Sequence, residues 1–250
     1  MSAARPGRGR RGLSFAAAAA AALVLWFAPE PAGLAAERTV SLRTADGLTL
    51  AATWYEPGNR PAPAVILVHM LGGSRRDWDS LGSRLAADGI GALAIDLRGH
   101  GSSDRVPMPG APPEYLAMVA DIEAARRYLA TRADVQHARI GVAGASLGAN
   151  LAALAGADDP AIRSLALLSP SLDYRGVRIE AAVRKYGSRP VLLVASDDDA
   201  YAGRSVKDLQ KAGSGVREAL RLTGAGHGSH MLARDNDLGR ALVDWFRRTL

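Results

Sequence analysis

The chain has 250 residues, and its 48% hydrophobic and 22% charged content suits one large α/β domain with an ordinary core. The net charge is +6, of which half lies in residues 1–36, and the remaining mixed surface has no basic run that would indicate nucleic-acid binding. The absence of cysteine excludes disulfides, thiolate metal sites and a cysteine nucleophile.

Residues 1–36 have the pattern of a targeting segment. An arginine-rich start is followed by an apolar run over residues 13–28 and then by small residues up to Ala36. The apolar run is long for a signal peptide and short for a membrane span. Gly33 and Ala35 fit cleavage after Ala35, and a cut after Ala36 fits nearly as well. We therefore expect an exported protein, periplasmic or secreted, with residues 1–36 as its signal peptide. The alternative is an uncleaved anchor formed by residues 13–28.

Residues 37–250 show a hairpin pattern followed by repeated strand–helix units. Such an order predicts a doubly wound, mostly parallel sheet of about eight strands flanked by helices. Ligands of such sheets bind beyond the carboxyl ends of the strands. The predicted strands are 39–44, 48–55, 64–68, 91–95, 138–143, 164–168, 191–195 and 216–222. The predicted helices are 77–88, 114–131, 149–157, 178–186, 204–212 and 236–249.

The stretch Gly144-Ala-Ser146-Leu-Gly148 lies between a predicted strand and a predicted helix. This is the G-x-S-x-G pattern of a nucleophile elbow. The turn is so sharp that a Cβ at either glycine would strike the neighbouring strand or helix. It also forces the serine into a strained conformation that lifts its hydroxyl clear of the sheet. Ser146 is therefore the expected nucleophile.

A serine hydroxyl needs an adjacent base, and the base needs an acid that orients it. His227 lies among glycines just after the last predicted strand, and His230 in the same loop is the alternative. Asp197, Asp198 and Asp199 follow the strand at 191–195. Asp199 is the expected acid, and Asp197 is the alternative because residues two apart share a side-chain direction. The other two acids are interpreted as a solvated turn.

The oxyanion of an acyl-transfer reaction needs preorganised N–H donors. One is expected from Leu147, which follows the nucleophile at a helix N-terminus. The other is expected from the loop at 69–74, where Leu71 is the first choice and Met70 the alternative. His69 ends a buried strand and is interpreted as a brace of this loop. No group of histidines and acids has ligand spacing on a shared element, so no metal site or cofactor is expected.

Taken together, these residues resemble the α/β-hydrolase superfamily over residues 39–250. Nucleophile, acid and histidine follow in the order typical of that superfamily. Residues 68–73 are similar to its His-Gly-x-x-Gly oxyanion loop, with Met70 in place of the usual glycine. Residues 96–103 are similar to its Asp-x-Arg-Gly-His-Gly-x-Ser segment, which implies that His100 is a structural turn residue. The chain most resembles small capless esterases of the dienelactone-hydrolase-like and serine-aminopeptidase-like kind.

The resemblance implies a serine hydrolase that cleaves small-molecule carboxylic esters or thioesters through an acyl-enzyme. Ser146 argues against dehalogenases and epoxide hydrolases, which carry aspartate there, and against dienelactone hydrolases proper, which carry cysteine. Only a short helix is expected between 168 and 191, so no cap domain is expected, and the loop 103–113 is interpreted as a rim. The alternatives are an acyltransferase or small peptidase on the same triad, and a non-catalytic binding protein of this fold.

Overall fold

The computed structural model describes residues 1–4 and 36–250. The expected signal peptide, including the apolar run 13–28, therefore lies outside the described residues except at its two ends. Within the described part of the chain, no helix combines the length and the apolar character needed to cross a membrane.

Eight strands form a single sheet in the order β1-β2-β4-β3-β5-β6-β9-β10. β2 (Thr49–Tyr55) pairs antiparallel with β1 (Glu37–Arg43) on one side and with β4 (Gly91–Ile95) on the other. From β4 onward all neighbours in the sheet pair parallel, through β3 (Ala62–Val68), β5 (Val135–Ala145), β6 (Ile162–Leu168), β9 (Val191–Ser196) and β10 (Arg217–Leu222). The predicted mostly parallel, eight-stranded sheet is confirmed.

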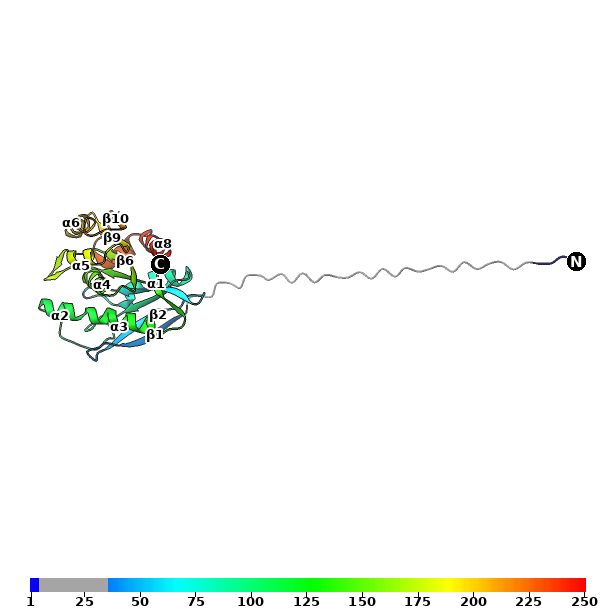
Figure 1. The fold of residues 1–250 in the computed structure, drawn as a ribbon, viewed down its shortest axis with the longest axis horizontal. Helices are drawn as coiled ribbons and strands as arrows, with labels where there is room; N and C mark the ends of the chain where they lie inside the picture. The colour runs from blue at the N-terminus through cyan, green and yellow to red at the C-terminus, as the bar shows by residue number, and fades with distance from the viewer. Residues whose placement is uncertain (5–35) are drawn as a thin grey trace. The chain divides into compact units, whose positions relative to one another are not determined.

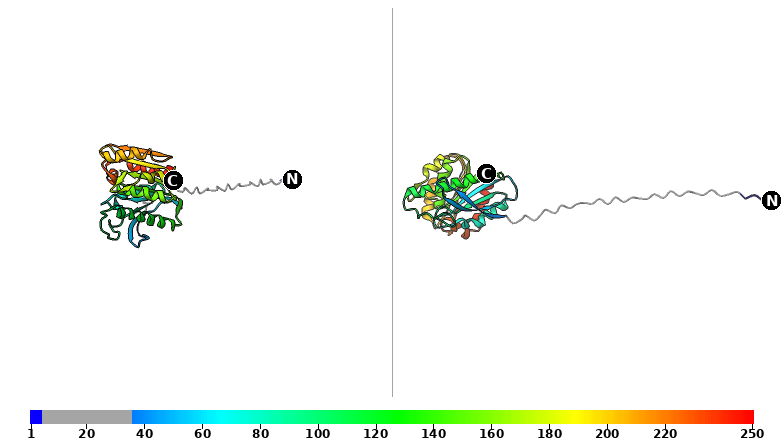
Figure 2. Two further views of the ribbon diagram at one scale, coloured as in Figure 1. Left: turned by 60° about the vertical axis from the view of Figure 1, so that its left-hand side comes forward. Right: turned by 90° about the horizontal axis from the view of Figure 1, so that it is seen from below.

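Helices cover both faces of this sheet (Figures 1 and 2). One face carries α3 (Val119–Ala130), α4 (Leu147–Asp158), α5 (Glu180–Lys185) and α6 (Ala200–Leu209). The opposite face carries α1 (Asp79–Ala87) and α8 (Leu238–Thr249). Shorter helices lie in the connections: η1 (Arg75–Trp78), α2 (Pro112–Ala117), η2 (Gly228–His230) and α7 (Met231–Arg234). The doubly wound arrangement is thus also confirmed.

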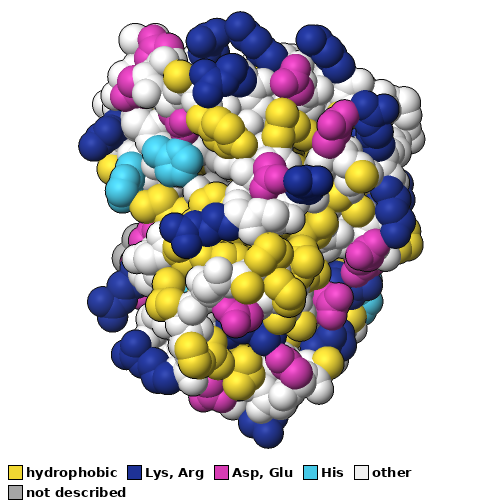
Figure 3. Space-filling view, turned by 90° about the vertical axis from the view of Figure 1, so that its left-hand side faces the viewer, with side chains coloured by type: hydrophobic (Ala, Val, Ile, Leu, Met, Phe, Trp, Pro, Cys, Tyr) yellow, Lys and Arg dark blue, Asp and Glu magenta, His cyan; other side chains and the backbone are white. Residues whose placement is uncertain are grey.

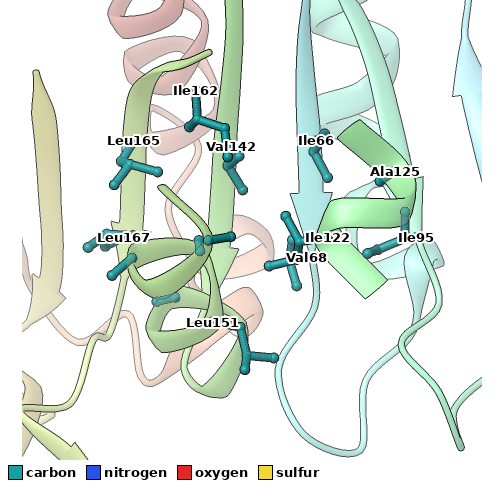
Figure 4. Close-up of a cluster of buried hydrophobic side chains, with 14 of the residues drawn as sticks. Ile66, Val68, Ile95, Ile122, Ala125, Val142, Leu151, Ile162, Leu165 and Leu167 are labelled. Atoms are coloured by element: carbon teal, nitrogen blue, oxygen red, sulfur yellow. The ribbon is translucent and has the colours of Figure 1, made fainter. Parts of the chain in front are cut away.

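The central strands are apolar along their whole length because both of their faces are covered. Figure 4 shows side chains of β3, β4 and β5, among them Ile66, Ile95 and Val142, beneath helices α3 and α4. Leu151 of α4 and Ile122 of α3 enter the same buried cluster. Each such aliphatic side chain stabilises the fold by about 2 kcal/mol when it leaves water. This cluster holds β3, β5 and α4 rigidly, and these elements carry the candidate site.

Some predicted boundaries were wrong. The helix predicted over 114–131 is two helices, α2 and α3, which meet at Met118, and α2 begins at Pro112 because proline suits a first helical turn. The helix predicted over 204–212 begins at Ala200, since the side chain of Asp199 caps it by accepting a hydrogen bond from Ala202 N at 3.1 Å.

The connection between β6 and β9 also contains a hairpin that was not predicted. Its strands are β7 (Asp173–Tyr174) and β8 (Val177–Arg178). Within the described part of the chain, this hairpin and α5 are the only elements in that connection, which leaves no cap domain there.

Candidate active site

The strands β3 and β5 mark the point at which the winding of the sheet reverses. β4 lies beyond β3 on one side, and β6 lies beyond β5 on the other. Ligands of doubly wound sheets bind at the carboxyl ends of the strands at such a point. Here the chain leaves β3 in the loop His69–Ser74, which we call the β3–η1 loop, and it leaves β5 at Ser146.

Ser146 lies in the sharp turn between β5 and α4. Its backbone is strained, with φ 51° and ψ −115°, and its side chain is 8% exposed. A Cβ on Gly144 would stand 2.2 Å from the carbonyl oxygen of Gly148, and a Cβ on Gly148 would stand 2.4 Å from the carbonyl oxygen of Val68. The prediction that no side chain fits at either glycine is confirmed.

The side chains of Ser146, His227 and Asp199 form one chain of hydrogen bonds. The imidazole of His227 donates from Nδ1 to Asp199 Oδ2 at 2.6 Å. With that proton on Nδ1, His227 Nε2 accepts from the Ser146 hydroxyl, and the two atoms are 2.7 Å apart. The other oxygen of Asp199 caps α6, so the helix end holds the carboxylate in place. The side chain of Asp199 is 13% exposed and that of His227 is 48% exposed.

The alternatives Asp197 and Asp198 contact the backbone next to His227 instead of its ring. Asp197 Oδ1 accepts from Gly224 N at 2.8 Å, and Asp198 Oδ1 accepts from Gly226 N at 3.0 Å. Their interpretation as a merely solvated turn was therefore incomplete, because both exposed carboxylates hold residues 224–229, which we call the histidine loop. His230 is exposed at the end of η2, and none of the hydrogen bonds of the described residues links it to Ser146.

Three serines that the sequence analysis missed also hold the histidine loop. Ser196 Oγ accepts from Ala225 N at 2.8 Å, and Ser169 Oγ accepts from Gly228 N at 3.0 Å. Ser229 Oγ donates to Asp77 Oδ2 at 2.8 Å, which joins the histidine loop to η1. The partners are 29 to 152 residues apart in the chain, so no local pattern could indicate them. Their position in the chain could have indicated two of them, since Ser169 and Ser196 lie where the strands β6 and β9 end.

Hydrogen bonds fix the orientation of the Met70–Leu71 peptide in the β3–η1 loop. The carbonyl oxygen of Met70 accepts hydrogen bonds from Gly73 N at 2.9 Å and from His69 Nδ1 at 2.7 Å. Because the peptide is planar and trans, the N–H of Leu71 points away from that oxygen. Leu147 N is in the first turn of α4, where no intrahelical acceptor exists. Neither N–H has a protein acceptor within the described residues.

His69 braces this loop, as the sequence analysis expected. It is fully buried, its Nε2 accepts from Leu97 N at 3.0 Å, and its Nδ1 donates to the Met70 carbonyl. Burial disfavours the charged imidazolium and lowers the pKa of His69 to about 4. His69 is consequently neutral near pH 7, in the tautomer that holds the Met70 carbonyl.

We expect this buried histidine to make the protein less stable in mild acid. Its pKa is lowered in the folded state, so the unfolded chain binds the extra proton as the pH falls below about 6.5. The free energy of unfolding should then drop by up to about 1.4 kcal/mol per pH unit until about pH 4, where the folded state also binds the proton. Denaturant unfolding at several pH values would measure the slope. A His69→Gln variant that retained the wild-type slope between pH 5 and 6.5 would contradict this assignment.

The segment 96–103 supports the β3–η1 loop from its neighbouring strand. The buried Asp96 accepts hydrogen bonds from Arg75 N at 2.7 Å and from Ser102 N at 2.8 Å, and it pairs with the Arg75 guanidinium. A Cβ on Gly101 would stand 2.1 Å from Asp96 Oδ2. His100 Nδ1 donates to the carbonyl of Arg98 at 2.9 Å, as expected for a structural turn residue.

One face of the molecule carries a hydrophobic patch. Figure 3 shows hydrophobic side chains gathered over the middle of this face, with histidine side chains at their margin and charged residues around them. A cavity of about 230 Å³ lies beside the expected rim. It is lined by Val106, Pro107 and Pro109 of the rim together with Arg98, Glu114 and Ala117. The hairpin contacts the end of that rim, since a Cβ on Gly176 would stand 2.6 Å from Pro112. Among the described residues, no cluster of three or more histidines and acids could hold a metal ion.

Known proteins share both sequence and fold with this chain. A family model described as serine aminopeptidase, S33, matches residues 59–192. A Mycobacterium tuberculosis protein described as uncharacterized is 30% identical over 236 residues, which cover 87% of this chain and 80% of that protein.

Two solved structures have the same fold at low sequence identity. A dienelactone hydrolase from Anabaena variabilis has a TM-score of 0.71 at 18% identity, covering 87% of this chain and 99% of its own. Est1E from Butyrivibrio proteoclasticus, solved with ferulic acid bound, has a TM-score of 0.69 at 21% identity, covering 83% of this chain and 99% of its own.

Proposed function

Because the chain belongs to the serine aminopeptidase (S33) family of α/β hydrolases, we propose that it is a serine hydrolase that cleaves carboxylic esters or thioesters through an acyl-enzyme. The observation that carries the proposal is the hydrogen-bonded series from Asp199 through His227 to Ser146, at 2.6 and 2.7 Å. A serine at a strained strand–helix turn, with an imidazole nitrogen within hydrogen-bond reach, is the arrangement that activates a hydroxyl for attack.

In the first half of the reaction, Ser146 Oγ attacks the carbonyl carbon while His227 Nε2 takes its proton. Asp199 stabilises the imidazolium that results, and it keeps Nδ1 protonated throughout. When the carbon–oxygen bond to the leaving group breaks, His227 returns the proton to the leaving oxygen. In the second half, His227 Nε2 takes a proton from water as the water oxygen attacks the acyl carbon. The bond from that carbon to Ser146 Oγ then breaks, His227 returns the proton to Ser146 Oγ, and the acid is released.

The negative oxygen of the tetrahedral intermediate needs N–H donors, for which we propose Leu147 and Leu71. The peptide orientations in the β3–η1 loop support Leu71 over the alternative Met70. The carbonyl oxygen of His69 faces α4, since a Cβ on Gly148 would stand 2.5 Å from it. The N–H of Met70 belongs to the same peptide and therefore points away from the N-terminus of α4, where the oxyanion would lie.

Esters are proposed ahead of amides because the dienelactone hydrolase of the same fold acts, by its name, on a cyclic ester. The second candidate is a peptidase, which the description of the family model favours. The test is a substrate panel that holds the acyl group constant, with p-nitrophenyl acetate, a thioester and a p-nitroanilide, in the presence and absence of added alcohol. Turnover of the esters without turnover of the anilide supports the proposal. Turnover of the anilide as well would favour the peptidase, since a serine peptidase also cleaves activated esters, and acetylated alcohol as the main product would favour an acyltransferase.

We also propose that residues 1–36 export the protein, with cleavage after Ala35 or Ala36. The support is the arginine-rich start, the apolar run 13–28 and the small residues that follow it. Cell fractionation and N-terminal sequencing of the exported protein would test this. A full-length N-terminus in the membrane fraction would favour the uncleaved anchor instead.

A further inference from the structure

Met70 places a flexible thioether side chain beside the candidate nucleophile. A Cβ built on Gly228 would stand 2.8 Å from Met70 Sδ and 3.6 Å from Ser146 Cβ. The side chain of Met70 and that of Ser146 therefore border the same small space, directly after His227 in the chain. Met70 is only partly buried, so its side chain forms part of the surface that a bound substrate meets.

Met70 and Leu71 are consecutive residues, but they pack against opposite sides of the site. Met70 packs against the buried cluster that contains Ala225 of the histidine loop and Met231 just beyond it. Leu71 packs against the cluster on the other face of the sheet, which includes Leu147, and the partly buried Leu172 and Tyr174 pack against that cluster too. Met70 and the histidine loop therefore lie toward one face of the sheet, and Leu71 lies toward the other.

The proposed reaction assigns a role to each side. The leaving oxygen must come within hydrogen-bond reach of His227 Nε2, because it receives its proton there. The leaving group therefore lies next to the histidine loop, on the Met70 side, and the acyl group extends toward Leu71. We propose that Met70 is a specificity-determining residue that restricts the size of the leaving alcohol, an inference that rests on the proposed function.

Two series of esters separate this role from an effect on the acyl group. The alcohol series consists of methyl, isobutyl and benzyl acetate, and the acyl series consists of methyl acetate, butyrate and hexanoate. Removing the side chain in Met70→Gly should raise kcat/KM for benzyl acetate relative to methyl acetate by about 10-fold, the lower end of the effect of one methylene group in a pocket. The ratios within the acyl series should stay within about twofold of wild type.

Met70→Leu is the matched control, since it nearly conserves the volume and should keep the wild-type ratios. Val216→Ala is a second control, because Val216 is 50% exposed and directly precedes β10, at the edge of the sheet opposite the site. Thermal unfolding of each variant checks that it folds. An alcohol series that is unchanged in Met70→Gly, or a change confined to the acyl series, would overturn the inference.

A second measurement does not need turnover. Phosphonylation forms a bond between Ser146 Oγ and phosphorus and expels the leaving group, either fluoride from an alkyl fluorophosphonate or 4-nitrophenolate from its 4-nitrophenyl counterpart. Met70→Gly should accelerate labelling by the 4-nitrophenyl reagent by about 10-fold relative to the fluoro reagent. A wild-type protein that is labelled but cleaves no ester would refute the proposed ester hydrolysis, while the labelling ratio still decides the role of Met70. A protein that neither labels nor turns over ester refutes both.

Discussion

Replacing Ser146 with alanine is expected to lower kcat/KM for ester hydrolysis by about 10⁴- to 10⁶-fold. The variant loses the only atom that can form the acyl-enzyme in the proposed mechanism, while the N–H groups of Leu71 and Leu147 remain. Those donors and substrate binding leave a small residual rate above that of water. The measurement is the initial rate on a p-nitrophenyl ester, together with the intact mass after treatment with a fluorophosphonate.

Two further variants make this result specific. Ser146→Gly should be equally inactive but about 1 kcal/mol more stable, because glycine accepts a φ of 51° without strain. Ser83→Ala removes an exposed hydroxyl on α1 that donates to the carbonyl of Asp79 at 2.9 Å, and it should keep full activity. Activity above about 1% of wild type in Ser146→Ala, or a phosphonyl adduct on that variant, would show that the nucleophile is another residue.

Asp199→Asn is expected to lower kcat by about 10⁴-fold at neutral pH. An amide can donate a hydrogen bond to Nδ1 of His227, which favours the tautomer that carries its proton on Nε2. In that tautomer Nε2 cannot accept the proton of Ser146. The fold should change little, because asparagine caps a helix as well as aspartate does, and α6 starts at this residue. Steady-state kinetics and thermal unfolding together distinguish lost chemistry from lost structure.

Asp197→Asn is the matched control. It also tests whether Asp197, the alternative that the sequence left open, is the acid that orients His227. The side-chain amide of this variant would still offer an oxygen to Gly224 N, which is the bond that the aspartate makes at 2.8 Å. Its kcat should therefore stay within about threefold of wild type, as for most exposed substitutions. If Asp197→Asn were the more damaging of the two, Asp197 would be the acid and the proposed triad would need revision.

The predicted fold agreed with the structure where the burial of a segment directly determines the pattern of its residues. A parallel strand covered on both faces must be apolar throughout, so runs such as Val65 to Val68 could be recognised without knowledge of their neighbours. The elbow could be recognised for a similar reason, because the steric limits that require its two glycines around the serine act within a single turn. The start of α6 was predicted less well, because its cap is Asp199, which the sequence analysis had assigned to the orientation of His227.

By itself, the sequence determined the type of sheet, the order of its units, and Ser146, His227 and Asp199 as candidates, because each of these depends on residues near to one another in the chain. The tertiary structure alone decided which aspartate faces His227, that the carbonyl of His69 faces α4, and that Met70 lies beside Ser146. The physical reason is that these contacts join the ends of different strands. Their geometry follows from how β3, β5, β9 and β10 are spaced and twisted in one sheet, and no local run of residues encodes that spacing.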